Sequence, residues 1–145
     1  MKQDIILAGV GGQGILSIAS VINNAALKKG LAMKQAEVHG MAQRGGAVQS
    51  HLRISDRPIY SDLIPRGEAD LILAVEPLEA LRYVDYLRPE GSVVTSSTPA
   101  VNIPDYPPLE AVLARIAQLG RHVIVDSGRL ALEAGAARAQ NMVML

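Results

Sequence analysis

The stretch ILAGVGGQGI, residues 6–15, most constrains the fold, because an apolar run passes directly into a cluster of glycines. Gly9, Gly11 and Gly14 spell G-x-G-x-x-G, and Gly12 adds another glycine. The run over residues 4–10 is apolar after its first residue, as in a strand covered on both faces. After the glycines, apolar residues recur at helical spacing as far as a KKG stop at Gly30. The pattern predicts a buried strand, a tight turn and a helix.

The rest of the chain alternates in the same way. A second strand is expected over about residues 32–38, and a β-hairpin is expected from strands 47–54 and 59–64 around an SDRP turn. Strand and helix patterns then follow each other over residues 70–75, 77–87, 92–96, 109–120, 122–127 and 128–139. This order predicts one α/β domain over residues 1–145, a three-layer Rossmann-like fold whose mostly parallel sheet is mixed by the inserted hairpin.

Composition limits the functions open to the chain. Lysine plus arginine equals aspartate plus glutamate at 14 each, so no net charge attracts nucleic acid or an anionic membrane. Cysteine is absent, which excludes disulfides, thiolate nucleophiles and an iron–sulfur cluster held by this chain alone. The N-terminus lacks the features of a signal or membrane-spanning segment, and we expect a cytoplasmic protein that binds neither nucleic acid nor membrane.

The glycine loop has three interpretations. Glycines let backbone N–H groups approach a phosphate at a helix N-terminus, which favours an anion site. They also allow a strand and a helix to pack closely without any ligand. The third interpretation is a dinucleotide site, which requires an acidic residue about 20 positions later. Glu37 follows Gly14 by 23 positions, which is close to this spacing. However, it is followed by His39 and a glycine-rich loop, and an ordinary NAD-binding βαβ unit has no such loop.

Ligands of such folds collect at the carboxyl ends of the strands. Three segments should converge there: the glycine loop, the HGMAQRGG segment of residues 39–46, and the end of DLILAVEP at Glu76. Arg44, flanked by Gln43 and two glycines, can present its guanidinium to a phosphate or carboxylate. The alternative interpretation is that Arg44 is a solvent-exposed loop residue with no ligand. His39 is either a loop hydrogen-bonding residue or a ligand contact.

Other polar motifs have structural interpretations. His51 and His122 lie on predicted strands, and no pair of histidines has metal-ligand spacing. The DSG of residues 126–128 resembles a nucleophile motif, but it lacks a G-x-S-x-G elbow and a partnered base, so it is interpreted as a helix N-cap. We therefore predict neither a catalytic residue nor a metal ligand in this chain.

Six stretches, taken in order, resemble one family: GVGGQGI, EVHGMAQRGGAV, SHLRIS, EADLILAVEPLEALRY, VNIP and ARAQNMVML. They are similar to the gamma-type domain of 2-oxoacid:ferredoxin oxidoreductases, and most specifically to the beta subunits of indolepyruvate:ferredoxin oxidoreductases. The resemblance covers essentially the whole chain.

The resemblance implies a division of labour. The family's complexes decarboxylate a 2-oxoacid oxidatively on thiamine diphosphate, pass electrons through iron–sulfur clusters to ferredoxin and release an acyl-coenzyme A. Thiamine diphosphate, magnesium and the clusters would belong to a large partner subunit, while this chain would close over the site and help to bind coenzyme A at the subunit interface. The implied binding residues are Gly9, Gly11, Gly12, Gln13, Gly14, His39, Gly40, Gln43, Arg44, Gly45, Gly46 and Glu76.

Members of the family continue for some tens of residues beyond an NMVML-like segment, so we expect a C-terminal truncation here. A helix missing from the sheet would leave an aliphatic patch that favours association, for instance as a homodimer. Two function classes stay open at this point. One is a non-redox subunit that is inactive alone, and the other is a free-standing Rossmann-like nucleotide-binding protein or NAD-dependent dehydrogenase.

Overall fold

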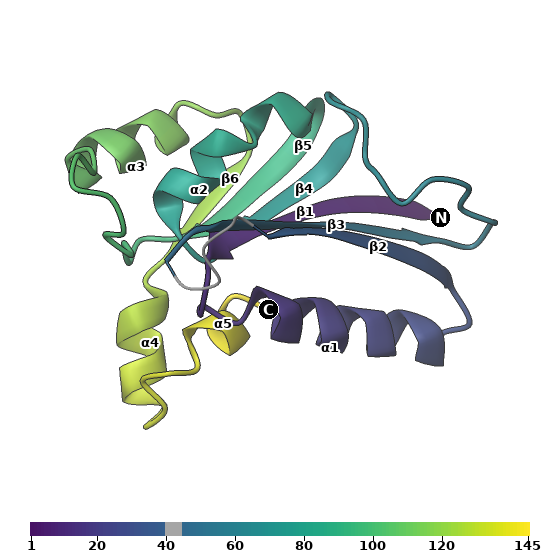
Figure 1. Cartoon of the computed structure of the whole chain (residues 1–145), viewed down its shortest axis with the longest axis horizontal. Helices are drawn as coiled ribbons and strands as arrows, with labels where there is room; N and C mark the ends of the chain where they lie inside the picture. The colour runs from purple at the N-terminus through teal and green to yellow at the C-terminus, as the bar shows by residue number, and fades with distance from the viewer. Residues whose placement is uncertain (40–44) are drawn as a thin grey trace.

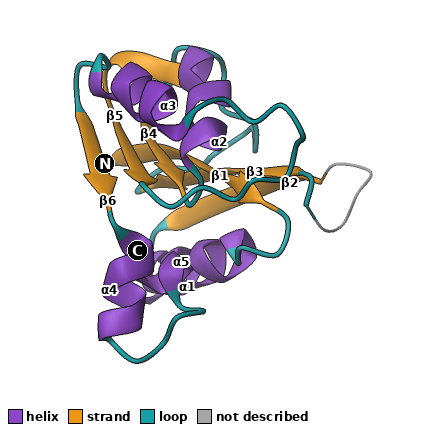
Figure 2. Cartoon of the chain, turned by 90° about the vertical axis from the view of Figure 1, so that its left-hand side faces the viewer, coloured by secondary structure: helices purple, strands orange, loops and turns teal. Residues whose placement is uncertain are grey.

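The fold is a mixed six-stranded sheet with helices on both faces (Figures 1 and 2). It was obtained as a computed structural model that describes residues 1–39 and 45–145, with only the backbone of His39. The strands are β1 (Lys2–Val10), β2 (Ala32–His39), β3 (Ala47–Ser55), β4 (Ala69–Ala74), β5 (Leu87–Ser96) and β6 (His122–Val125). The helices are α1 (Ile15–Lys28), α2 (Pro77–Arg82), the 3₁₀ turn η1 (Val84–Tyr86), α3 (Leu109–Ala117), α4 (Ser127–Glu133) and α5 (Gln140–Val143).

The strand order is β2-β3-β1-β4-β5-β6. Strands β1, β4, β5 and β6 run parallel, whereas β3 is antiparallel to both of its neighbours. The predicted mixed α/β fold is therefore confirmed. Helix α1 leads from β1 to the outer edge on one face, and α2 leads from β4 to β5 on the other face, so the chain changes direction between β1 and β4 (Figure 1). Such a switch point is where open α/β sheets bind their ligands.

Alternation along β1 divides the core into two layers. Ile5 and Leu7 pack toward α1, while Ile6 and Ala8 pack toward α2 and α3. Leu7 and Ile6 are fully buried, as expected for a central strand covered on both faces. The core is aliphatic because the chain contains neither phenylalanine nor tryptophan.

The hairpin partner of β3 differs from the prediction. Residues 59–64 form no strand, and the hairpin consists of β2 and β3. Strand β3 has β2 on one side and β1 on the other, so neither side is left to pair with residues 59–64. Pro58 and Pro65 at the ends of that stretch also disfavour a strand.

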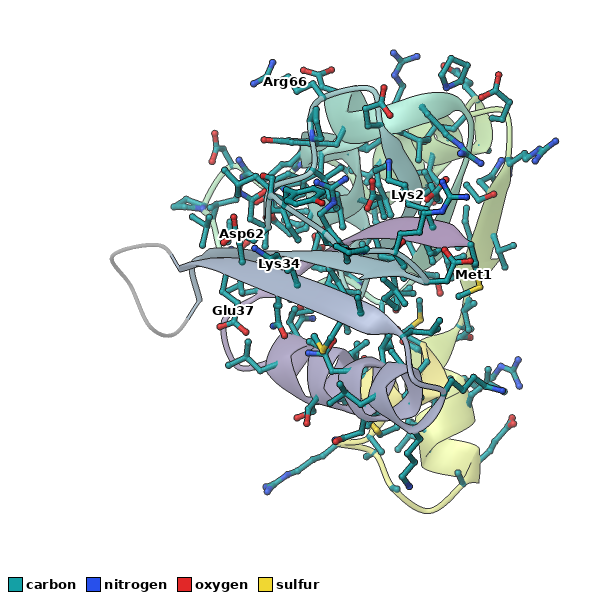
Figure 3. The ribbon with its side chains drawn as sticks, turned by 90° about the vertical axis from the view of Figure 1, so that its right-hand side faces the viewer. Met1, Lys2, Lys34, Glu37, Asp62 and Arg66 are labelled. Carbon is teal, nitrogen blue, oxygen red and sulfur yellow. The ribbon has the colours of Figure 1, made fainter. Side chains whose placement is uncertain are left out.

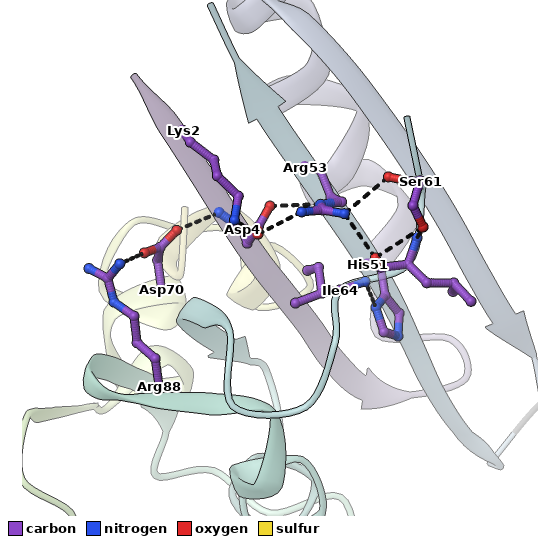
Figure 4. A network of polar contacts seen from close by, with 9 residues as sticks. Lys2, Asp4, His51, Arg53, Ser61, Ile64, Asp70 and Arg88 are labelled. Carbon is purple, nitrogen blue, oxygen red and sulfur yellow. Dashed lines mark hydrogen bonds and ion pairs between the residues drawn. The ribbon is translucent and has the colours of Figure 1, made fainter. Parts of the chain in front are cut away.

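Residues 56–68, which we call the strap, instead cross the face of the sheet on side-chain contacts. Arg53 donates to the carbonyl groups of Ser61 and Leu63 at 3.2 and 3.0 Å, and His51 accepts from the backbone N–H of Ile64 at 3.0 Å (Figure 4). The side chains of β3 thereby satisfy backbone groups of the strap that a sheet partner would otherwise satisfy.

Helix lengths also depart from the expected patterns. The helix predicted over residues 77–87 ends at Arg82 and continues as η1, and the stretch 128–139 gives only the short α4. Asp126 is the N-cap of α4 and accepts from the N–H of Arg129 at 3.1 Å, as interpreted from the sequence. Among the described residues, no helix has the length and apolar content that crossing a bilayer requires.

Candidate functional site

Two of the predicted segments meet at the carboxyl edge of the sheet. The N–H of Gly11 donates to the carbonyl of Gly46 at 2.8 Å, and the N–H of Gly45 donates to the carbonyl of Gly11 at 3.4 Å. These hydrogen bonds extend the pairing of β1 with β3 beyond Val10, so the glycine loop and the Gly45–Gly46 segment lie side by side. The convergence expected from the sequence is confirmed for these two loops.

The turn of the glycine loop is closed by Gln13. Its N–H donates to the carbonyl of Val10 at 3.0 Å, and its carboxamide oxygen accepts from the N–H of Val10 at 2.8 Å. Gly14 then begins α1 with a left-handed backbone, and no side chain caps the helix. A helix that begins without a side-chain cap leaves its first N–H groups for solvent or a ligand, and its dipole favours an anion there.

Close packing explains two of the glycines without any ligand. A Cβ atom at Gly9 would lie 2.7 Å from Cδ1 of Ile15, because the strand and the helix almost touch at this position. At Gly14, φ is 77° and a Cβ atom would lie 2.4 Å from Nδ2 of Asn141. Gly12 differs, since its φ is 101° and the space beside it is open. Packing therefore accounts for Gly9 and Gly14, and a ligand contact at Gly12 stays a prediction.

A cavity of about 440 Å³ opens beside Gly12, at the switch point between β1 and β4. Its walls combine the glycine loop, the residues that follow β5 and the segment before α5. The lining residues include Gly12, Gln13, Val75, Thr98, Arg138 and Asn141. Backbone amides, a hydroxyl, carboxamides and one guanidinium are suited to a polar or anionic ligand.

Glu76 lies at the end of β4 as predicted, but its side chain points into the protein and is only 1% exposed. One carboxylate oxygen caps α2 by accepting from the N–H of Glu79 at 2.8 Å. The other accepts from the N–H of Ala100 at 3.3 Å and from the hydroxyl of Tyr106. The structure thus gives Glu76 a positioning role beneath the site, and direct contact with a cofactor stays a prediction.

Four predicted residues are not fully tested by this geometry. Strand β2 ends at His39, whose backbone pairs with Val48. The side chain of His39, together with Gly40, Gln43 and Arg44, lies outside the described residues. Their binding roles stay predictions.

Two asparagines at this edge were missed by the sequence interpretation. Asn102 donates from its side chain to the carbonyl of Gly45 at 2.7 Å, and Asn141 donates to the carbonyl of Gly14 at 3.3 Å. Both lie in stretches that carried the family resemblance, VNIP and ARAQNMVML, which was the available signal. Periodicity could not find them, because each acts across more than 50 residues of sequence.

The polar residues that the structure describes around the site form no metal centre. Within residues 1–39 and 45–145, no group of three or more His, Cys, Asp or Glu side chains is placed to hold a metal ion. His51 is buried away from the cavity, and its contact with the strap agrees with the structural role interpreted from the sequence.

Comparison with known proteins identifies the family. Residues 4–145 match the family described as Pyruvate ferredoxin/flavodoxin oxidoreductase. The chain belongs to this family. It is 40% identical to the indolepyruvate oxidoreductase subunit IorB of Pyrococcus horikoshii, over the whole chain and 76% of that relative. It is 34% identical to the 2-oxoglutarate synthase subunit KorC of Methanothermobacter marburgensis, over 65% of the chain and 50% of that relative.

Solved structures agree on the fold. A 2-oxoglutarate:ferredoxin oxidoreductase from Magnetococcus marinus matches with a TM-score of 0.76 and 22% identity, over 99% of the chain and 23% of that much longer chain. The pyruvate oxidoreductase subunit PORC of Thermotoga maritima matches with a TM-score of 0.71 and 19% identity, over 99% of the chain and 72% of the other. The chain is thus an oxidoreductase subunit of this family, with the family's fold along its length.

Proposed function

We propose that this chain is the non-redox subunit of a 2-oxoacid:ferredoxin oxidoreductase, which closes over the active site of a large partner subunit and helps to bind coenzyme A. The proposal is supported by similarity to IorB over the full length of the chain. By similarity to that relative, the proposed substrate class is an aromatic 2-oxoacid of the indolepyruvate type. We also propose a cytoplasmic location, which suits a partner that delivers electrons to ferredoxin.

The observation that carries the binding role is the junction of Gly11 with Gly45 and Gly46 beside the open cavity. We use the term anion mouth for residues 9–14, 45 and 46 together. Backbone N–H groups and the N-terminal end of the α1 dipole favour an anion there, and Arg44 would supply the positive charge. The structure of the 2-oxoglutarate:ferredoxin oxidoreductase from Magnetococcus marinus has coenzyme A bound, and the phosphates of that cofactor are anions of the required kind.

The residues around the cavity are suited to binding part of coenzyme A at an interface with a partner subunit. The cavity is open, has both apolar and polar walls and lies where ligands of such sheets bind. Because the chain has no cysteine, it supplies no thiolate for a cluster. In this mechanism the chain binds and orients a phosphate and excludes water, and the chemistry of decarboxylation stays with thiamine diphosphate in the partner.

The strand order argues against the alternative of an NAD-dependent dehydrogenase. A dinucleotide fold needs its acidic residue at the end of the strand that neighbours β1. Here β3 occupies that place and runs antiparallel, so Glu37 on β2 lies two strands, or about 10 Å, from β1. Figure 3 shows Glu37 and Lys34 on this outermost strand. Micromolar binding of NAD in calorimetry would reverse this ranking.

The test is reconstitution. The chain is mixed with the large subunit of a 2-oxoacid:ferredoxin oxidoreductase, and 2-oxoacid-dependent reduction of an electron-acceptor dye is measured with and without coenzyme A. We expect no activity from the chain alone and coenzyme A-dependent activity from the pair. A large subunit whose activity and KM for coenzyme A are unchanged by this chain would contradict the proposal.

A further inference from the structure

Residues 97–108, which we call the edge loop, contain no helix or strand but are fixed at several points. At its start, the N–H of Ser97 donates to the carbonyl of Val125 at 2.8 Å, and the N–H of Thr98 donates to Oγ of Ser96 at 2.9 Å. In its middle and near its end, Ala100 and Tyr106 donate to Glu76. The edge loop therefore has a defined position despite its irregular backbone.

The carboxylate of Glu76 is the main anchor. It is buried, and it joins the edge loop to the first turn of α2 through Glu79. Burial, and after it the hydrogen bond to Glu76, raises the pKa of Tyr106, so its hydroxyl stays a donor at physiological pH. An anchor built on a buried carboxylate is strong, because a hydrogen bond to a charged acceptor exceeds one between neutral groups.

From this anchored loop, Asn102 reaches across to the anion mouth. Its Nδ2 donates to the carbonyl of Gly45 at 2.7 Å, while the next residue, Gly46, accepts from Gly11. The Gly45–Gly46 segment is thus held on two sides, by the glycine loop and by the edge loop. Gly45 has a φ of 78°, which glycine adopts without strain. Because glycine also adopts many other conformations, contacts with neighbouring segments are needed to fix the orientation of its carbonyl.

We infer that Asn102 is a positioning residue for the anion mouth: its carboxamide fixes the Gly45 carbonyl and thereby the direction of the Gly46 N–H, which lies in the same peptide plane. This inference rests on the proposed function. A free carbonyl beside an anion repels it, whereas one that accepts from Asn102 has its dipole committed elsewhere. Tyr106 acts one step further back, by holding the loop from which Asn102 extends.

The test uses three variants of the full chain. Asn102→Ala removes the donor, and Asn102→Asp replaces it with a carboxylate that repels the Gly45 carbonyl. Val101→Ala is the matched control, since Val101 is the adjacent residue and is 70% exposed. Two quantities are measured: amide hydrogen exchange at Gly11 and Gly45 in the chain, and the KM and kcat of the reconstituted complex with coenzyme A.

We expect Asn102→Ala to accelerate exchange at Gly11 and Gly45 and to raise the KM for coenzyme A about three- to tenfold, the value of one hydrogen bond, with kcat and melting temperature unchanged. Asn102→Asp should have the larger effect, and Val101→Ala should match the wild type. Tyr106→Phe should accelerate exchange at the same two glycines, because it loosens the loop without touching the mouth.

Two results would overturn the inference. One is wild-type exchange at Gly11 and Gly45 in both Asn102 variants. The other is accelerated exchange with an unchanged KM for coenzyme A in a complex whose KM does depend on the presence of this chain. Failure of the proposed function is distinguishable from both, because there the KM would not depend on the chain at all.

Discussion

The guanidinium of Arg53 holds the carboxylate of Asp4 through two hydrogen bonds, from Nε to Oδ1 at 2.9 Å and from Nη2 to Oδ2 at 3.0 Å. The third nitrogen of the same group donates to the strap at Ser61 and Leu63 (Figure 4). The side chain of Asp4 is 1% exposed and that of Arg53 is 13% exposed, so the pair is largely shielded from bulk water. One side chain therefore connects β1, β3 and the strap.

This pair gives the first prediction. Arg53→Met leaves the buried Asp4 carboxylate beside the exposed Lys2, and it should lower the free energy of unfolding by about 3–5 kcal/mol in urea denaturation. The double variant with Asp4→Leu should recover most of that loss, since no unpaired charge remains. Lys2→Met is the control and should cost less than about 1 kcal/mol. Equal losses for Arg53→Met and Lys2→Met would refute this account.

The second prediction concerns His51. Its Nδ1 accepts from Ile64, and burial, followed by the charge of Arg53, lowers its pKa below the usual 6.5, with Asp62 acting weakly in the opposite direction. As the pH falls, His51 therefore binds a proton in the unfolded chain near pH 6.5, whereas in the folded chain it binds that proton only at lower pH. The free energy of unfolding should therefore be constant above that pH and decrease as the pH falls below it.

His51→Asn keeps an acceptor near the position of Nδ1 but does not titrate, so its unfolding free energy should depend less on pH between about 5 and 7. His122→Asn, at an exposed histidine at the start of β6, is the matched control for the same substitution. The measurement is urea unfolding across that pH range. Parallel curves for His51→Asn and the wild type would show that another group carries the dependence.

Local pattern was sufficient for the parts of the fold that a few neighbouring residues determine. The apolar run of β1 and the helical spacing of apolar residues in α1 were enough to predict both elements. Burial of one face or both faces of an element leaves such a pattern in the sequence itself. The sequence predicts a strand over residues 59–64, yet these residues cross the sheet as part of the strap. Whether such a segment pairs depends on a free strand edge, and here β2, which is distant in the sequence, occupies the edge of β3.

The site divides in the same way. The convergence of the glycine loop with Gly45 and Gly46 follows from a general property of α/β sheets, so it was predictable. Asn102, Asn141 and the anchoring of Glu76 depend on single side chains that cross from one segment to another, and no spacing rule records such contacts. Glu76 was predicted at the correct edge, but the sequence could not indicate that its carboxylate faces inward to Tyr106.

The third prediction separates backbone strain from packing at the glycine loop. Gly14 and Gly30 have similar φ values, 77° and 71°, but only Gly14 has Asn141 in the space that a Cβ atom would fill. Gly30→Ala should cost about 1–2 kcal/mol of unfolding free energy through strain alone. Gly14→Ala should cost more and should also shift the NMR signals of the Asn141 side chain. Equal costs and unshifted signals would mean that α5 does not press on the loop.

The last prediction concerns Arg44, which lies outside the described residues and directly precedes the Gly45–Gly46 junction. Gly45 and Gly46, which follow Arg44 in the sequence, are held against Gly11. We expect the guanidinium of Arg44 to add a positive charge to the anion mouth. A charge-assisted bidentate contact is worth about 1.5–3 kcal/mol, or about 10- to 150-fold in affinity.

We therefore expect Arg44→Ala either to weaken subunit assembly or to raise the KM for coenzyme A by about that factor. The melting temperature should change little, because a loop arginine contributes little to the core. Arg44→Lys should recover only part of the loss, since a point charge does not reproduce the planar fork. Arg57→Ala, an exposed arginine in the strap, is the control. If Arg44→Ala, Arg44→Lys and the wild type agree within about twofold in both quantities, while Gly11→Val disrupts only folding, then both loops are structural and the mouth binds no anion.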